Sequence, residues 1–192
     1  MKKFLQDHSY NMVKMFLNQI AIAMFGFSLA IATAKAQNVA LRNATSVCAI
    51  LFYLFLLYSM TWEIGFSDKV SVESGKKRSM PLKGALISLC ANVLNFLLAI
   101  FITLAQLLPQ SFLSSVGAVS STIAILTEGM YMGLLTNHFH GDALNSYWWV
   151  YFLLPIPAIL TCGVAYQMGI HDFKLSALFK SSPNVPKSGM KK

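Results

Sequence analysis

Five long apolar stretches constrain the fold of this chain more strongly than any other feature. Each is close to the ~20 residues that an α-helix needs to cross the ~30 Å hydrocarbon layer of a bilayer. Hydrocarbon tolerates only helices or closed barrels, and the sequence has no run of about ten residues with alternating polarity. We therefore predict an all-α fold, a polytopic integral membrane bundle of five hydrophobic helices. The stretches cover approximately residues 11–34, 44–62, 84–108, 116–136 and 147–168.

The composition agrees with a membrane protein. Hydrophobic residues make up 56% of the 192 residues and charged residues 11%, whereas about a quarter of a typical soluble domain is charged. We predict a single transmembrane domain over residues 1–170 and a basic, disordered tail over 171–192, because the tail is polar and contains prolines. The segment Ala34-Lys35-Ala36 fits the small-residue rule for signal cleavage, but the length of the first stretch favours its retention as a helix.

The distribution of basic residues leaves two topologies open. Of the 15 lysines and arginines, three lie in the N-terminal region, two in the link 35–43, five in the loop 64–83 and five in the tail. If all five stretches cross, the two sides carry nearly equal numbers. If the stretch 116–136 re-enters instead, 13 of the 15 share one side. The positive-inside rule favours re-entry, and the length of the stretch favours crossing. Both topologies make the N-terminus and the 64–83 loop cytoplasmic.

The 64–83 loop is predicted to be short and hairpin-like, because valines alternate with polar residues before a Ser-Gly turn at 74–75. We expect Glu63 and Asp68 to pair with lysines of this loop.

A cluster of basic residues in the same loop is a candidate docking site for a partner or for anionic lipid. It consists of Lys76, Lys77 and Arg78. The net charge of +8 comes with no basic stripe interleaved with aromatic residues, so we expect no nucleic-acid partner.

Among the residues of the apolar stretches, Glu128 should cost the most free energy to place in a bilayer. A carboxylate near the bilayer centre costs roughly 2.5–3.5 kcal/mol on insertion scales, so such a residue is a candidate for ion or ligand binding. Asn92 and Asn95 share a polar helical face and are the predicted hydrogen-bond donors to it. The alternative is a purely structural contact between helices, for which Gly129 and Gly133 would allow a second backbone to approach closely.

A second candidate site follows Glu128 in the sequence. His138, His140 and Asp142 occupy alternate positions, which would face one side of an extended segment and could bind a divalent metal. The segment offers no fourth ligand, so a solvated loop is the alternative. Further on, Pro155 and Pro157 predict a kink or break in the last helix.

The sequence contains no motif of an enzyme, neither H-E-x-x-H nor G-x-S-x-G, and its three cysteines have no metal-ligand spacing. We therefore expect no catalysis and no cofactor. Two functional classes fit. The first is an accessory subunit of a membrane complex that contacts lipids, a membrane protein partner or a second copy of itself. The second is a small transporter, channel or membrane-embedded ligand-binding subunit that uses Glu128 and the face of Asn92 and Asn95.

Overall fold

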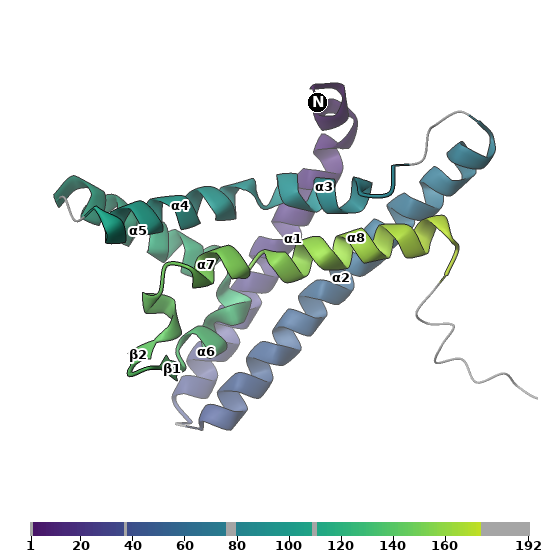
Figure 1. Ribbon diagram of the computed structural model, residues 1–192. Coiled ribbons are helices and arrows are strands. Elements are labelled where there is room, and N and C mark those ends of the chain that lie inside the picture. The colour runs from purple at the N-terminus through teal and green to yellow at the C-terminus, as the bar shows by residue number, and fades with distance from the viewer. Residues whose placement is uncertain (1, 37, 76–79, 109–110, 174–192) are drawn as a thin grey trace, which may run out of the picture.

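The computed structural model describes residues 2–36, 38–75, 80–108 and 111–173, most of which are helical (Figure 1). The all-α prediction is confirmed, with one small hairpin as the exception. The elements are α1 (Lys2–Ala34), α2 (Val39–Glu73), α3 (Lys83–Ala91), α4 (Val93–Leu107), α5 (Ser111–Thr127), the 3-10 turn η1 (Gly129–Tyr131), α6 (Met132–Leu135), β1 (His138–Phe139), β2 (Asp142–Ala143), the 3-10 turn η2 (Leu144–Ser146), α7 (Val150–Leu153) and α8 (Ile156–Ile170).

Three helical segments are each long and apolar enough to cross a membrane, namely Phe4–Ala34, Val39–Glu73 and Val150–Ile170. Two further pairs pass the same test only if each bent pair counts as one span, which would give five. The α3–α4 pair is bent by 54°, and the α5–η1–α6 pair by 81°. All five predicted stretches are therefore helical, but two of them are sharply broken.

The breaks have local causes. At the α3–α4 break the Ser88 carbonyl accepts both the backbone N–H of Asn92 at 3.0 Å and its side-chain amide at 2.9 Å, and a second bond of this kind favours bending of the helix. The interruption predicted near Pro155 and Pro157 is confirmed between α7 and α8, because proline offers no backbone N–H to continue the ladder.

The α2 helix is longer at both ends than predicted, so the hairpin-like shape predicted for the 64–83 loop is wrong. The first half of that segment is helical, because buried Thr61, Gly65 and Asp68 continue the α2 face that packs against α8. This packing outweighs the strand preference of the valines. The predicted turn is confirmed, since Gly75 has a φ of +71° and follows the end of the helix.

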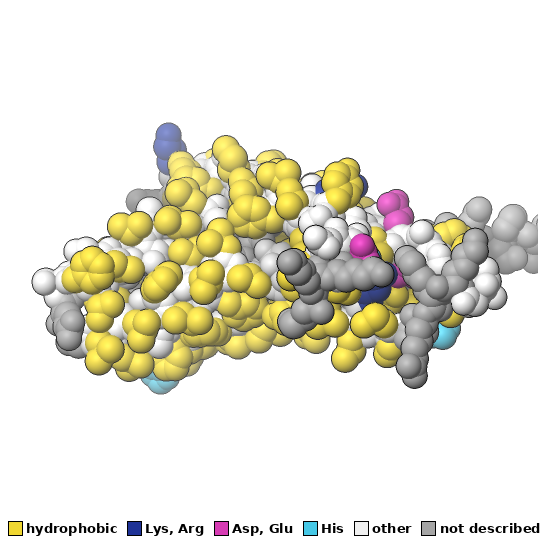
Figure 2. All heavy atoms as spheres, turned by 90° about the horizontal axis from the view of Figure 1, so that it is seen from above, with side chains coloured by type: hydrophobic (Ala, Val, Ile, Leu, Met, Phe, Trp, Pro, Cys, Tyr) yellow, Lys and Arg dark blue, Asp and Glu magenta, His cyan; other side chains and the backbone are white. Residues whose placement is uncertain are grey.

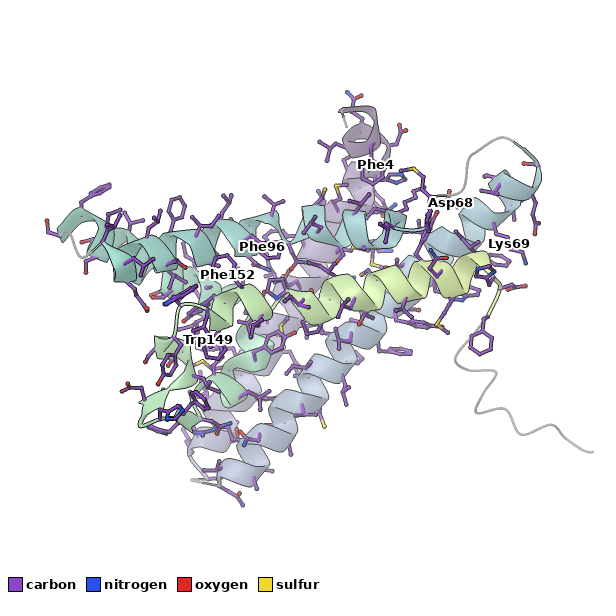
Figure 3. The ribbon with its side chains drawn as sticks, viewed as in Figure 1. Phe4, Asp68, Lys69, Phe96, Trp149 and Phe152 are labelled. Carbon is purple, nitrogen blue, oxygen red and sulfur yellow. The ribbon has the colours of Figure 1, made fainter. Side chains whose placement is uncertain are left out.

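One end of the bundle, called here the loop end, joins the end of α2 to the end of α8. Lys69 Nζ lies 3.6 Å from Asp172 Oδ2, and Trp62 Nε1 donates to the Phe173 carbonyl at 2.8 Å. Figure 3 places Asp68 and Lys69 on this side of the molecule. The last described residues of the chain therefore lie beside the 64–83 loop.

The opposite end, called the link end, gathers the α1–α2 link and the segments around the small hairpin. The Arg42 guanidinium donates to Asn137 Oδ1 at 3.2 Å, and Asn137 Nδ2 donates to Asn43 Oδ1 at 2.9 Å. Near the end of α4, Gln106 Nε2 donates to the Ser146 carbonyl at 3.0 Å. Both the chain leaving α4 and the chain leaving α6 are therefore held at the link end.

The outer surface of the bundle is strongly apolar. Large hydrophobic side chains are exposed on every long helix, among them Phe55 at 62%, Val119 at 60% and Leu160 at 63%. Figure 2 shows one face covered largely by such side chains, with the visible acidic groups gathered on its right side. This distribution is the reverse of what a water-exposed surface normally carries.

Candidate functional site

Glu128 lies at the break between α5 and η1 and is only 4% exposed. The side-chain amide of Gln19, on α1, reaches two acceptors at this point. It donates to Glu128 Oε1 at 3.0 Å and to the Thr127 carbonyl at 3.3 Å. That carbonyl is among the last of α5, where helical partners run out. Gln19 therefore holds both the carboxyl group and the broken backbone.

Two buried phenols complete the surroundings of Glu128. Tyr53 comes from α2 and Tyr131 from η1, and Glu128 acts electrostatically on both. Within the described part of the chain, the buried Tyr131 hydroxyl has no hydrogen-bond partner. An unpaired buried polar group costs about 1–3 kcal/mol, so the Tyr131 hydroxyl adds to the free-energy cost of the polar groups buried near this break.

Close backbone contact brings the break against α1. A Cβ added to Gly129 would collide with the Ala23 carbonyl, and one added to Gly26 would collide with the backbone of Met130. Gly133 meets α2 in the same way. The predicted close approach at Gly129 and Gly133 is confirmed: α1 lies against the break at Gly129, and α2 lies against Gly133.

Asn92 and Asn95 are buried, as expected of a polar face, but they are not the donors to Glu128. Asn92 Nδ2 bonds the Ser88 carbonyl, and Asn95 Nδ2 donates to Asn92 Oδ1 at 2.9 Å. The donor is Gln19, which sequence reasoning missed. The available signal was its polar side chain inside the first apolar stretch.

A second buried acid lies at the loop end. Asp68 of α2 forms an ion pair with Lys83 at the start of α3, and the Tyr166 hydroxyl donates to Asp68 Oδ2 at 2.9 Å. The predicted pairing of Asp68 with a loop lysine is confirmed. Glu63 has no ion pair among the described residues, so its predicted pairing is not found there.

The three metal-ligand candidates do not converge. His140 and Gly141 have φ values of 52° and 97°, which form a two-residue turn between β1 and β2, with His138 opposite Ala143. The chain reverses at His140, so the alternation that would have aligned His138, His140 and Asp142 is lost. No group of three histidine, cysteine or acidic side chains among the described residues could hold a metal ion.

The basic docking candidates Lys76, Lys77 and Arg78 lie outside the described residues, as does the tail from residue 174 onward. The comparisons with models of protein families, with curated proteins and with solved structures find no match. The function has to be inferred from the geometry.

Proposed function

We propose that the protein is a multi-pass integral membrane protein of the cell membrane, with four crossing segments and one re-entrant segment. The crossing segments are α1, α2, the α3–α4 pair and the α7–α8 pair, and the re-entrant segment is α5–η1–α6. The apolar side chains exposed on every long helix support insertion in lipid. Re-entry is supported by the 81° bend at Glu128 and by the link end, which holds the chain on both sides of this segment.

In this topology the N-terminus, the 64–83 loop and the tail all lie on the cytoplasmic side. The proposal is supported by the end of α8, which contacts α2 at the loop end through Asp172 and Phe173. It places 13 of the 15 basic residues on one side, as the positive-inside rule favours. A reporter fused after Lys192 tests it, because an externally active fusion would require an odd number of crossings.

The function that we propose is reversible proton binding at Glu128, in the class of small transporters and channels. The observation that carries it is a buried carboxyl group at a helix break whose hydrogen-bond donor is a neutral amide, with no cationic partner among the described residues. In hydrocarbon the neutral acid is far less costly than the anion, so burial favours the form of Glu128 that has bound a proton. Broken helices at membrane depth are typical of transport sites. Gln19 engages one carboxyl oxygen, and the other can carry the proton.

Carbodiimide labelling tests this proposal directly, because a protonated carboxyl group in apolar surroundings adds across a C=N bond of the reagent, giving its oxygen to the carbon and its proton to the nitrogen. We expect one adduct on Glu128 in the full-length protein, with labelling that falls as the pH rises, and no adduct in Glu128→Gln. Glu73→Gln, at the exposed end of α2, is the matched control and should leave labelling unchanged. A Glu128 that stays unlabelled at every pH would contradict the proton site and leave the accessory-subunit role. If sodium ions instead protect Glu128 from labelling, the ion that this site binds is a metal cation and not a proton.

A further inference from the structure

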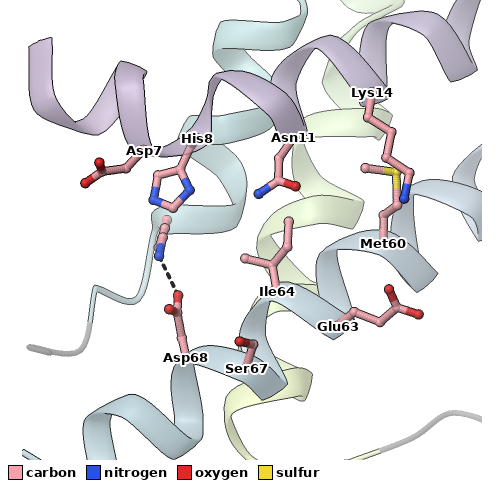
Figure 4. A pocket seen from close by; sticks show the side chains of 10 residues that line it. Asp7, His8, Asn11, Lys14, Met60, Glu63, Ile64, Ser67 and Asp68 are labelled. Carbon is pink, nitrogen blue, oxygen red and sulfur yellow. Dashed lines mark hydrogen bonds and ion pairs between the residues drawn. The ribbon is translucent and has the colours of Figure 1, made fainter. Parts of the chain in front are cut away.

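Two polar cavities lie at opposite ends of the bundle. The first has a volume of about 310 Å³ and opens at the loop end between α1, α2 and the start of α3. Figure 4 shows His8, Asn11 and Lys14 of α1 facing Glu63 and Asp68 of α2 across it. A cavity of this volume has room for several water molecules.

The second cavity has a volume of about 240 Å³ and lies between α4 and α5. Its polar lining residues are Gln106, Ser114, Ser121 and Asn145. The hydrogen bond from Gln106 to the Ser146 carbonyl places this cavity on the link-end side of the bundle. It contains only neutral polar groups, whereas the cavity at the loop end is lined by both acids and bases.

A polar face of α1 leads from the loop-end cavity toward Glu128. Asn11 lines the cavity, and Asn18 follows seven residues later on the same helical face. Asn18 Nδ2 donates to the sulfur of Met60, a residue of the cavity wall, at 3.2 Å. The next residue, Gln19, bonds Glu128. Eight residues of helix separate Asn11 from Gln19, which is roughly 12 Å.

A matching face of α5 leads from the link-end cavity to the same carboxyl group. Ser114 and Ser121 line that cavity, and Glu128 follows Ser121 after another seven residues. This spacing repeats on one helical face, and seven residues of helix span roughly 10 Å. The two approaches therefore reach Glu128 from opposite ends, along different helices.

We propose that the two cavities are the two aqueous access routes of one proton pathway, with Glu128 as the relay between them. The proposal rests on the proton site proposed above. A proton passes from water in one cavity, by transfer between hydrogen-bonded water molecules that enter the polar gap, to the free oxygen of the Glu128 carboxylate, and it later leaves that oxygen in the same way toward the other cavity. Only O–H bonds form and break, and the carboxyl group returns to its starting state. Asn18 and Ser121 are the positioning residues that keep the two short gaps polar.

Proton flux into liposomes tests the pathway. The full-length protein is reconstituted with a pH-sensitive dye inside, and a potassium diffusion potential drives proton uptake. Asn18→Leu and Ser121→Leu should each lower the flux by about tenfold or more, since a modest rise in barrier has that effect on a rate. Ser28→Leu on α1 and Ser115→Leu on α5 are matched controls, because both serines are exposed and neither lines one of the two cavities. These controls should keep wild-type flux.

Carbodiimide labelling of Glu128 in the same samples separates the two proposals. Full labelling with low flux in both leucine variants supports two access routes to an intact proton site. Full labelling with unchanged flux in either variant overturns the corresponding route. Loss of labelling in the wild-type protein overturns the proton site itself. A leucine variant that elutes as an aggregate is replaced by Asn18→Ala or Ser121→Ala, which must show the same fall in flux.

Discussion

Glu128 and Asp68 are both buried acids, but the bundle neutralises them in different ways. Asp68 is 6% exposed and has the Lys83 ammonium and the Tyr166 hydroxyl as partners. Glu128 is 4% exposed, and its partner is the uncharged amide of Gln19. A carboxylate with a fixed cation has no need of a proton, so Asp68 is suited to holding three helices together. A carboxyl group without a cation must exchange its proton to change charge.

Removal of the cation at the loop end should produce the largest loss of stability. Lys83→Met leaves the Asp68 carboxylate buried without its counter-charge, and breaking a buried pair in this way costs about 3–5 kcal/mol. Thermal unfolding in detergent should show a clear fall in melting temperature. The double variant Lys83→Met/Asp68→Leu should recover most of it. A stable single variant would mean that the pair is solvated.

Removal of the amide at the break should have a smaller effect. Gln19→Leu leaves Glu128 and the Thr127 carbonyl without their donor, and an unsatisfied buried group costs about 1–3 kcal/mol. We expect a moderate fall in melting temperature together with weaker orientation of Glu128. Carbodiimide labelling should persist, because the carboxyl group remains. An equal fall in melting temperature in Gln19→Leu and Lys83→Met would show that Glu128 and Asp68 depend on their partners to the same degree.

Replacement of the relay acid by its amide should barely change stability. Glu128→Gln keeps an oxygen that can accept from Gln19 and removes the ionisable proton, so we expect a change within about 1 kcal/mol. Flux and labelling should both disappear. The matching change Asp68→Asn should have the opposite effect on stability and lower the melting temperature, because it weakens the ion pair with Lys83. Flux that survives in Glu128→Gln would refute a relay at this residue.

The exposed ion pair at the loop end should have the smallest effect of all. The side chains of Lys69 and Asp172 are 26% and 49% exposed, and surface pairs contribute about 0–1 kcal/mol. Asp172→Asn should leave the melting temperature nearly unchanged at physiological salt. A drop as large as that of Lys83→Met would show that burial is not what separates the two pairs.

The sequence was sufficient to predict helices, because apolar runs of ~20 residues allow few other folds. It also indicated that a buried Glu128 would need a partner and that Pro155 and Pro157 would interrupt a helix. It could not identify Gln19 as the partner, because a single polar residue in an apolar stretch does not reveal which distant helix it will meet. The hairpin predicted in the 64–83 loop was wrong for a related reason. Local alternation of valines was outweighed by the burial of Gly65 and Asp68 against α8.

The contact of Gly129 with Ala23 also constrains the order in which the molecule can be made. Ribosomal synthesis completes α1 and α2 long before the broken segment, so the surface that receives the break can already be in the bilayer when Glu128 emerges. A broken helix cannot satisfy its backbone in lipid by itself, and a preassembled surface removes that difficulty. The last described helix, α8, then packs on α2. In the membrane topology proposed above, insertion during synthesis would therefore be directional, and the early pair α1–α2 would serve as the template for the segment that carries Glu128.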